Sequence, residues 1–171
     1  MVTDSGLSIE QVVGDNETFW AVIDMKVREL MAKNPKLRRE DAQEMVFGDV
    51  INPYSMSHSS LYAVRDESKT VIASALGVVH PGMISLGGKN SFEIVDVFVD
   101  PSRRNHRISY HVTAYMLNAA KEAGFSEVFA KVPFKDKVPQ RLFSRLGFQW
   151  DYTELNPNLR PSHNVYSKIL R

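Results

Sequence analysis

The chain has 171 residues, which is enough for one domain with a sizeable hydrophobic core. It carries 21 Lys and Arg, 20 Asp and Glu and a formal net charge of +1, so its overall charge draws it neither to nucleic acid nor to an anionic membrane. It has no Cys, which excludes disulfides, thiolate metal ligands and Cys nucleophiles, and no apolar run is long enough to span a membrane. The first eleven residues lack the basic and apolar regions of a signal peptide, and we therefore expect a soluble, cytoplasmic protein.

Residues 12–52 predict two helices. Asp15 and Asn16 are good N-cap residues, and the apolar residues after them recur at helical spacing. A second helical pattern runs from about Arg39 to Val50. The Asn-Pro pair at 52 and 53 is expected to end it, because a proline disfavours helical backbone in the residue before it.

Residues 60–170 alternate between strand and helix patterns. Strands are predicted at 61–64, 70–79, 92–99, 127–132, 148–152 and 164–169, and helices at 108–123 and 139–146. The run at 92–99 is apolar at most positions, which indicates a central strand. This order predicts a single α/β (or α+β) domain over residues 1–171, with a mixed sheet.

A basic loop joins the strand at 92–99 to the helix at 108–123. It places Arg103, Arg104, His106 and Arg107 within five positions. A helix N-terminus presents unpaired N–H groups and the positive end of the helix dipole, so basic residues there favour an anion site. A solvated basic turn is the alternative reading of the same residues.

Glu93 and Asp96 are the two carboxylates of the apolar strand. Strict alternation places Glu93 with Val95 and Val97, and Asp96 on the other face with Ile94. At most one of the two carboxylates then lies in any one cleft. A carboxylate on an apolar strand face can have a raised pKa, which suits a general base, and a structural ion pair is the alternative for each.

The sequence disfavours a metal site, a serine nucleophile and a nucleic-acid site. The five His residues form no pair at helical spacing and no cluster with acidic residues, so no metal site is predicted. Ser57-His58-Ser59 fits a polar loop better than a nucleophile, because adjacent residues do not form a catalytic triad. The basic cluster is small and has no interleaved aromatic residues, which disfavours a nucleic-acid site.

Three motifs, in their order and spacing, resemble the GNAT superfamily of acetyl-CoA-dependent N-acetyltransferases. They are Val99-Asp100-Pro101 at the end of the apolar strand, the basic loop that opens the long helix, and Leu142 to Phe148 as L-x-x-x-L-G-F. The resemblance covers roughly residues 61–168. It implies a GNAT-like domain with a mixed, mostly antiparallel sheet, splayed near 92–99, and helices on both faces.

The resemblance also implies a coenzyme A site on the strand and the loop. Its residues would be Val97, Phe98, Val99, Arg104, Asn105, His106, Arg107, Ile108 and Ser109. In the family's loop pattern, Arg/Gln-x-x-Gly-x-Gly/Ala, Arg104 matches, whereas Arg107 and Ser109 replace the usual small residues. Glycine lets the backbone approach a phosphate with no Cβ in the way, so Arg107 either blocks the loop or contacts the phosphates itself.

For catalysis, the resemblance implies that Glu93, or Asp96, takes the proton from the acceptor amine, directly or through water. Phe143 stands where the family often has a tyrosine that protonates the departing thiolate, so water or Tyr152 must replace it. The acceptor would be an amine on a small molecule or a protein, bound beside the two N-terminal helices.

The departures at Arg107 and Phe143 support an alternative. The chain would keep the GNAT fold without the chemistry, as a binding or structural protein, for example a phage virion or host-interaction component. A homo-oligomer or larger assembly is compatible with both readings. Cofactor binding separates them, because only the enzyme requires acetyl-CoA.

Overall fold

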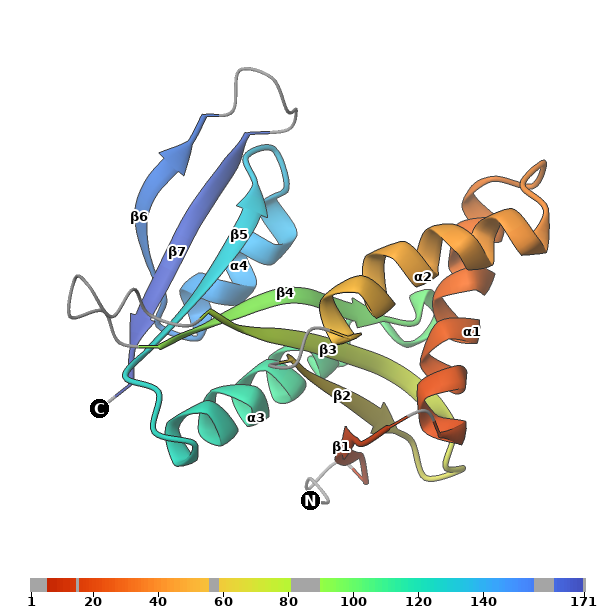
Figure 1. The fold of residues 1–171 in the computed structure, drawn as a ribbon, viewed down its shortest axis with the longest axis horizontal. Coiled ribbons are helices and arrows are strands. Elements are labelled where there is room, and N and C mark those ends of the chain that lie inside the picture. The colour runs from red at the N-terminus through yellow and green to blue at the C-terminus, as the bar shows by residue number, and fades with distance from the viewer. Residues whose placement is uncertain (1–5, 15, 56–58, 81–89, 156–161, 171) are drawn as a thin grey trace.

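The computed structural model describes residues 6–14, 16–55, 59–80, 90–155 and 162–170. In chain order the elements are β1 (Ser8–Val12), α1 (Glu17–Lys33), α2 (Arg39–Ser55), β2 (Ser59–Arg65), β3 (Val71–His80), β4 (Ser91–Val99), a 3-10 turn (Pro101–Arg103), α3 (Ile108–Glu122), β5 (Glu127–Pro133), α4 (Lys137–Arg145), β6 (Gln149–Glu154) and β7 (His163–Ile169), as Figure 1 shows. Within these ranges, no helix is both long and apolar enough to cross a membrane.

Seven strands form one sheet in the order β1-β2-β3-β4-β5-β7-β6. The pair β4–β5 is parallel and the other neighbours are antiparallel, so the predicted mixed, mostly antiparallel sheet is confirmed. The parallel pair follows from the connection through α3, which returns the chain to the same end of the sheet.

The predicted helices on both faces of the sheet are also confirmed (Figure 1). The larger core lies between the sheet and the helices α3 and α4, and includes Val112, Met116 and Phe143. The second core lies on the opposite face under α1 and α2, and includes Val22, Ile23 and Ala42. Each helix therefore buries one apolar stripe against the sheet.

The two halves of the sheet separate between β4 and β5. These strands pair only where Phe92–Ile94 meets Val128–Ala130, and beyond Ile94 they diverge, as the ribbon in Figure 1 shows. The splay predicted near the central strand is present. It leaves the end of β4 without a strand partner on one side.

A bulge in β4 overturns the prediction that Glu93 and Asp96 face opposite sides. Leu76 pairs with Asp96 while Gly77 pairs with Ile94, so Val95 is an extra residue on β4. An extra residue inverts the alternation of everything after it. Both carboxylates therefore face the side of α1 and α2.

The packing of β4 agrees with this inversion. Phe92 and Ile94 before the bulge lie in the same core as Val97 and Val99 after it, although strict alternation separates them. Gly77, on β3, is required beside the bulge, because a Cβ there would lie 2.1 Å from the ring of Phe92.

Most predicted boundaries shift by a few residues, and two differences are larger. The strand β1 was not predicted, because in its five residues only Ile9 and Val12 are buried and the alternation is too short to see. The helix α2 was expected to end at the Asn-Pro pair, but it runs through Pro53 to Ser55. A proline in the last turn costs one backbone hydrogen bond, and it therefore does not stop the helix as it would in the middle.

Candidate active site

A cleft of about 1320 Å³ opens where β4 and β5 diverge. Its walls are the end of β4, the loop and first turn of α3, the end of β5, and α4. Its charged lining residues are Arg103, Arg104, Arg107, Lys131, Arg141 and Arg145, against Asp96 and Asp136. Because cations outnumber carboxylates, the cleft suits an anionic ligand.

Two residues of the basic loop adopt left-handed backbone conformations. Arg107 is the N-cap of α3 and adopts the left-handed conformation, with φ 57° and ψ 17°. Asn105 is also left-handed, with φ 71°. The position at which the family has glycine therefore keeps the conformation that favours glycine, even though the residue is arginine.

The start of α3 offers backbone donors to the cleft. The first helical bond runs from the N–H of His111 to the C=O of Arg107, so the N–H groups of residues 108–110 have no partner within the helix. Ile108 and Ser109 line the cleft beside Arg107. His106 is exposed and is not among the lining residues.

Two of the four basic residues in the loop hold it to the rest of the fold. Arg104 donates to Glu29 of α1 at 2.5 Å, and its Nε donates to the carbonyl of Val99 at 3.2 Å. Arg103 pairs with Asp66 at 2.8 Å. Within the described ranges, Arg107 makes no ion pair, which leaves its side chain for a ligand in the cleft.

Glu29 is a buried carboxylate of α1. Burial raises the pKa of Glu29, but hydrogen bonds from Lys33 and Arg104 outweigh burial and hold that pKa below its ordinary value. The ion pair with Arg104 therefore fixes the loop to α1 with a fully charged partner.

Glu93 forms a pair that the sequence did not predict. Its Oε2 lies 2.6 Å from Nε2 of His80, at the end of β3. The Glu93 side chain is 12% exposed and that of His80 is 48% exposed, and the His80 ring lies 5.4 Å from the ring of Phe129. Val78 pairs with Glu93, and His80 lies two residues after Val78 on β3, so the side chains of His80 and Glu93 lie on the same face of the sheet. This neighbourhood follows from the strand register, which the sequence alone does not give.

Asp96 is held differently from Glu93. Its Oδ2 accepts a hydrogen bond from Lys26 of α1 at 2.7 Å, and Lys26 also lies over the ring of Phe98, 4.9 Å from its centre. Asp96 lines the cleft. The ion pair with Lys26 favours a structural role for Asp96 over that of a base, because a largely buried lysine already balances the charge of the carboxylate.

The two aromatic candidates lie in different places. Phe143 is buried in the larger core and packs edge-to-face on Phe148, with ring centres 5.0 Å apart. Tyr152 is exposed on β6 opposite Val165 and is not among the residues that line the cleft. Glu154 is the main cause of a raised pKa of Lys131, a lining residue, and Tyr152 adds a smaller electrostatic contribution.

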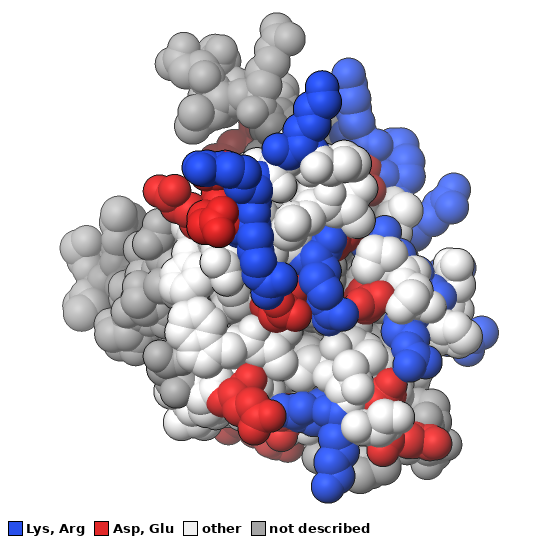
Figure 2. All heavy atoms as spheres, turned by 90° about the vertical axis from the view of Figure 1, so that its right-hand side faces the viewer, with Lys and Arg blue, Asp and Glu red and all other residues white. Residues whose placement is uncertain are grey.

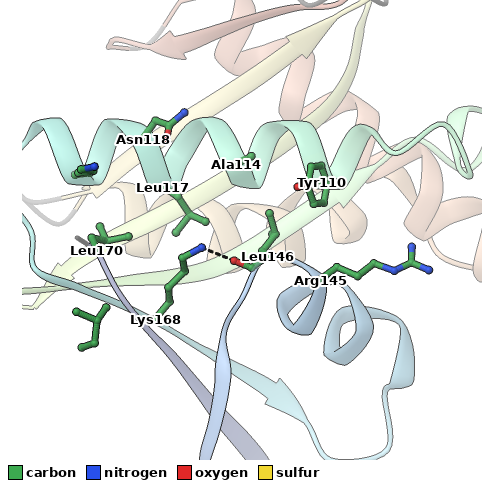
Figure 3. Close-up of a pocket in the computed structure, with 10 residues that line it drawn as sticks. Tyr110, Ala114, Leu117, Asn118, Arg145, Leu146, Lys168 and Leu170 are labelled. Carbon is green, nitrogen blue, oxygen red and sulfur yellow. Dashed lines mark hydrogen bonds between the residues drawn. The ribbon is translucent and has the colours of Figure 1, made fainter.

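A smaller cavity of about 320 Å³ lies between α3, the end of α4 and the end of β7 (Figure 3). Tyr110 and Arg145 line both openings. Between α4 and β7, Nζ of Lys168 donates to the carbonyl of Leu146, which closes the end of α4 onto the sheet. This hydrogen bond holds together two of the elements that line the cavity, the end of α4 and β7.

No group of three or more His, Asp or Glu side chains that could hold a metal ion occurs in the part of the chain that the structure describes. On the side that Figure 2 shows, basic and acidic side chains lie beside one another over much of the face. On α1 and α2, Asp24 pairs with both Arg28 and Arg39, which is one source of this mixture.

Solved structures with the same fold include several acetyltransferases. RimL, a ribosomal L7/L12 alpha-N-protein acetyltransferase in complex with coenzyme A, is 14% identical with a TM-score of 0.72 over 99% of this chain and 97% of that chain. The NatC complex bound to Gag peptide and CoA is 11% identical with a TM-score of 0.70, over 96% and 99%. PaiA N-acetyltransferase from Thermoplasma acidophilum, in complex with coenzyme A, is 12% identical with a TM-score of 0.66, over 95% and 99%.

At these low identities, the TM-scores show that the folds are shared and nothing more. A comparison with curated protein sequences gives no match. Nothing in the comparisons points to a virion or host-interaction component. The model of the family described as "Acetyltransferase (GNAT) family" matches residues 25–148, which is more than two thirds of the 171 residues. The chain therefore belongs to the GNAT family of acetyltransferases.

Proposed function

We propose that this protein transfers the acetyl group of acetyl-CoA to a primary amine on a protein or a small molecule. One observation carries the proposal. Arg107 caps α3 in the left-handed conformation that favours glycine, and it lines a cleft whose charged side chains are mostly cations. Family membership supplies the reaction class.

The pantetheine arm of the cofactor would lie along β4. Beyond Ile94 this strand has no partner on the β5 side, so backbone groups of Val97 to Val99 can pair with the amides of the arm. Phe98 lies between these two valines, and its ring packs on the second core under α1. The arm would therefore replace the missing strand.

The pyrophosphate would bind at the start of α3. The N–H groups of Ile108 and Ser109 are free of helical bonds, and the Arg107 side chain can add a charged donor. Asn105 and His106 complete the loop, which Arg104 anchors to α1. In this arrangement the backbone shapes the site and Arg107 adds charge to it.

Glu93 is the proposed base. Glu93 is not itself among the lining residues, but it directly precedes the lining residue Ile94 at the point where β4 and β5 part. Within the described residues it forms no ion pair with a lysine, whereas Asp96 does. Glu93 takes a proton from the acceptor ammonium, and the neutral amine attacks the thioester carbonyl carbon. The C–N bond forms, the C–S bond breaks and the nitrogen loses its second proton to water, which balances the proton that the thiolate takes up.

The thiolate that leaves takes a proton from water or from Tyr152. Phe143 cannot supply one, and the exposed cleft admits water. Because Tyr152 is not among the lining residues, we expect water to serve. Tyr152→Phe should then leave kcat nearly unchanged, whereas a loss on the order of 10²-fold would assign the role to Tyr152.

The first experiment compares thermal unfolding with acetyl-CoA, with ATP and without ligand. Acetyl-CoA at about 100 times Kd should stabilise the fold by about 2.7 kcal/mol, and for a chain of this length that raises Tm by about 5–10 °C. An equal rise with ATP would identify a general anion site. No rise with millimolar acetyl-CoA would refute the transferase.

The second experiment measures acetylation of defined probes: peptides with a free α-amino group, spermidine and glucosamine. Glu93→Gln should lower kcat on the order of 10²–10⁴-fold and leave the Kd of acetyl-CoA unchanged. Glu122→Gln is a matched control, since Glu122 is an exposed carboxylate at the end of α3. Equal activity of the Glu93 variant and the wild type would remove Glu93 from the mechanism.

A further inference from the structure

The cleft holds more positive charge than its ion pairs use. Some of its cationic lining residues pair with carboxylates, namely Arg103, Arg104 and Lys131. The others form no ion pair within the described ranges, namely Arg107, Arg141 and Arg145. The proposed function places Arg107 at the pyrophosphate. Two unpaired arginines of α4 are therefore left without an assigned ligand.

We propose that Arg141 and Arg145 bind the 3′-phosphate of coenzyme A and make the protein selective for this cofactor over its 3′-dephospho form. The inference rests on the proposed function, because it concerns the same cofactor. It is carried by the position of the two guanidinium groups in the cleft and by their lack of a carboxylate partner in the part of the chain that the structure describes.

The helix α4 presents both arginines to the cleft from one face. Val138, Leu142 and the two arginines line the cleft at spacings of three and four residues, which places them on the same side of a helix. Both arginines are exposed, whereas Phe143 between them is buried in the larger core. A ligand in the cleft can therefore reach both guanidinium groups without displacing the core.

Arg145 lies near the start of α3, where the pyrophosphate would bind. Arg145 and Tyr110, a residue of the first turn of α3, line both the cleft and the smaller cavity (Figure 3). The free N–H groups of Ile108 and Ser109 belong to the same turn. In coenzyme A only the ribose separates the pyrophosphate from the 3′-phosphate, so this phosphate must bind close to that turn. Arg145 meets this condition, and Arg141 lies about one helical turn before it.

The carboxylates of the cleft do not oppose an anion at this place. Asp96 and Asp136 are the lining carboxylates. Asp96 is balanced by Lys26 at 2.7 Å. Asp136 is the N-cap of α4, where its side chain accepts a hydrogen bond from the N–H of Val138 at 3.2 Å. It precedes Arg145 by nine residues, or about 13 Å along the helix axis.

The C-terminal end of α4 needs its own positive charge before an anion can bind there. The last carbonyls of a helix carry the negative end of its dipole. Nζ of Lys168 donates to the carbonyl of Leu146, and Arg145 lies in the last turn. A favourable contact with the dipole is therefore the structural alternative for Arg145. Arg141 lies in the middle of α4, so this alternative does not apply to it.

The chemistry of the two side chains fits a phosphate monoester. A guanidinium donates several N–H groups in a fixed plane and binds phosphate oxygens in pairs. The 3′-dephospho form offers a neutral hydroxyl at the same position. Because a hydrogen bond between charged groups contributes on the order of tenfold or more to affinity, the wild type should bind coenzyme A on the order of 10–100-fold more tightly than 3′-dephospho-coenzyme A.

Isothermal titration calorimetry of the full chain with these two probes tests the proposal. Arg141→Gln and Arg145→Gln should each lower the ratio of the two Kd values on the order of tenfold, and the double variant should bring it close to one. The Kd of 3′-dephospho-coenzyme A should stay unchanged in all three variants. Arg107→Ala should weaken both probes by the same factor and so keep the wild-type ratio.

Lys36→Gln is the matched control for charge. It removes one positive charge from an exposed residue between α1 and α2 that does not line the cleft, and it should leave the ratio unchanged. Glutamine keeps a helix propensity close to that of arginine, so the α4 variants should fold, and Tm is measured for each of them.

Each outcome decides the proposal. A wild-type ratio that falls in both single variants of α4, but not in Arg107→Ala or Lys36→Gln, would support it. Equal binding of the two probes by the wild type, or a ratio that persists in the double variant, would overturn it while the proposed function stands. An equal fall in Lys36→Gln would replace the contact by a general effect of charge. A wild type that binds neither probe at millimolar concentration would refute the proposed function, and the phosphate site with it.

Discussion

Replacing Arg107 by glycine should make the protein more stable and its acetyl-CoA binding weaker. Arg107 has φ 57°, a conformation that costs a residue with a Cβ about 1–2 kcal/mol. Glycine removes this cost, but it also lowers the free energy of unfolding by about 0.5–1 kcal/mol, because it increases the conformational entropy of the unfolded chain. The net gain is about 0.5–1 kcal/mol, or a rise in Tm of about 1–4 °C for a chain of this length.

Arg107→Ala is the matched control for this substitution. It removes the same guanidinium but keeps the Cβ, so its Tm should stay close to that of the wild type. Both variants should bind acetyl-CoA on the order of tenfold more weakly, because a hydrogen bond from a charged donor contributes about 1.5–3 kcal/mol. Thermal unfolding gives the stability and isothermal titration calorimetry gives the Kd.

The expected change in stability and the expected change in acetyl-CoA binding can fail separately. If Arg107→Ala is stabilised as much as Arg107→Gly, the strain does not come from the Cβ. If both variants bind acetyl-CoA as tightly as the wild type, the side chain makes no contact with the phosphates and the backbone amides hold them alone.

Two further substitutions test the scaffold of the site. Gly77→Ala should lower the free energy of unfolding by about 1–3 kcal/mol, since its Cβ would lie 2.1 Å from Cζ of Phe92, and an unchanged urea midpoint would contradict this. Glu29→Gln should cost about 1–2 kcal/mol at pH 7, less than a fully buried pair because Arg104 is half exposed. The pKa of Glu29 is depressed in the folded state, so its contribution is present above the unfolded value of 4.5 and is lost as pH falls through the lower folded value. The stability difference between wild type and Glu29→Gln should therefore shrink in urea titrations below pH 4.5, and a constant difference would argue against a charged Glu29.

Most of the fold could be predicted from the sequence because its signals are local. Asn16 was predicted to cap the first helix, and its side chain accepts a bond from the N–H of Phe19 at 3.1 Å. Gly124 and Gly147 directly follow the helices predicted at 108–123 and 139–146, and both have the positive φ that commonly ends a helix. Periodic apolar residues and turn residues of this kind act within a few positions of the chain.

The candidate site was predicted less completely because its geometry depends on contacts between distant strands. The bulge at Val95, which turns Glu93 and Asp96 to one face, appears only in the pairing with β3. The same register is needed to bring His80 to Glu93. The conformation of Arg107 was hidden for another reason: its residue type argued against the left-handed backbone that the loop imposes.

The ion pairs of α1 determine which parts of the protein open together. Lys26 holds α1 to Asp96 of β4, and Glu29 holds it to Arg104 of the loop. If α1 detached by local unfolding, it would leave largely buried charges unpaired on both sides, so the helix and the loop form one cooperative unit for hydrogen exchange. A ligand that stabilises the loop should therefore also slow hydrogen exchange at the amides of α1, although it touches none of them.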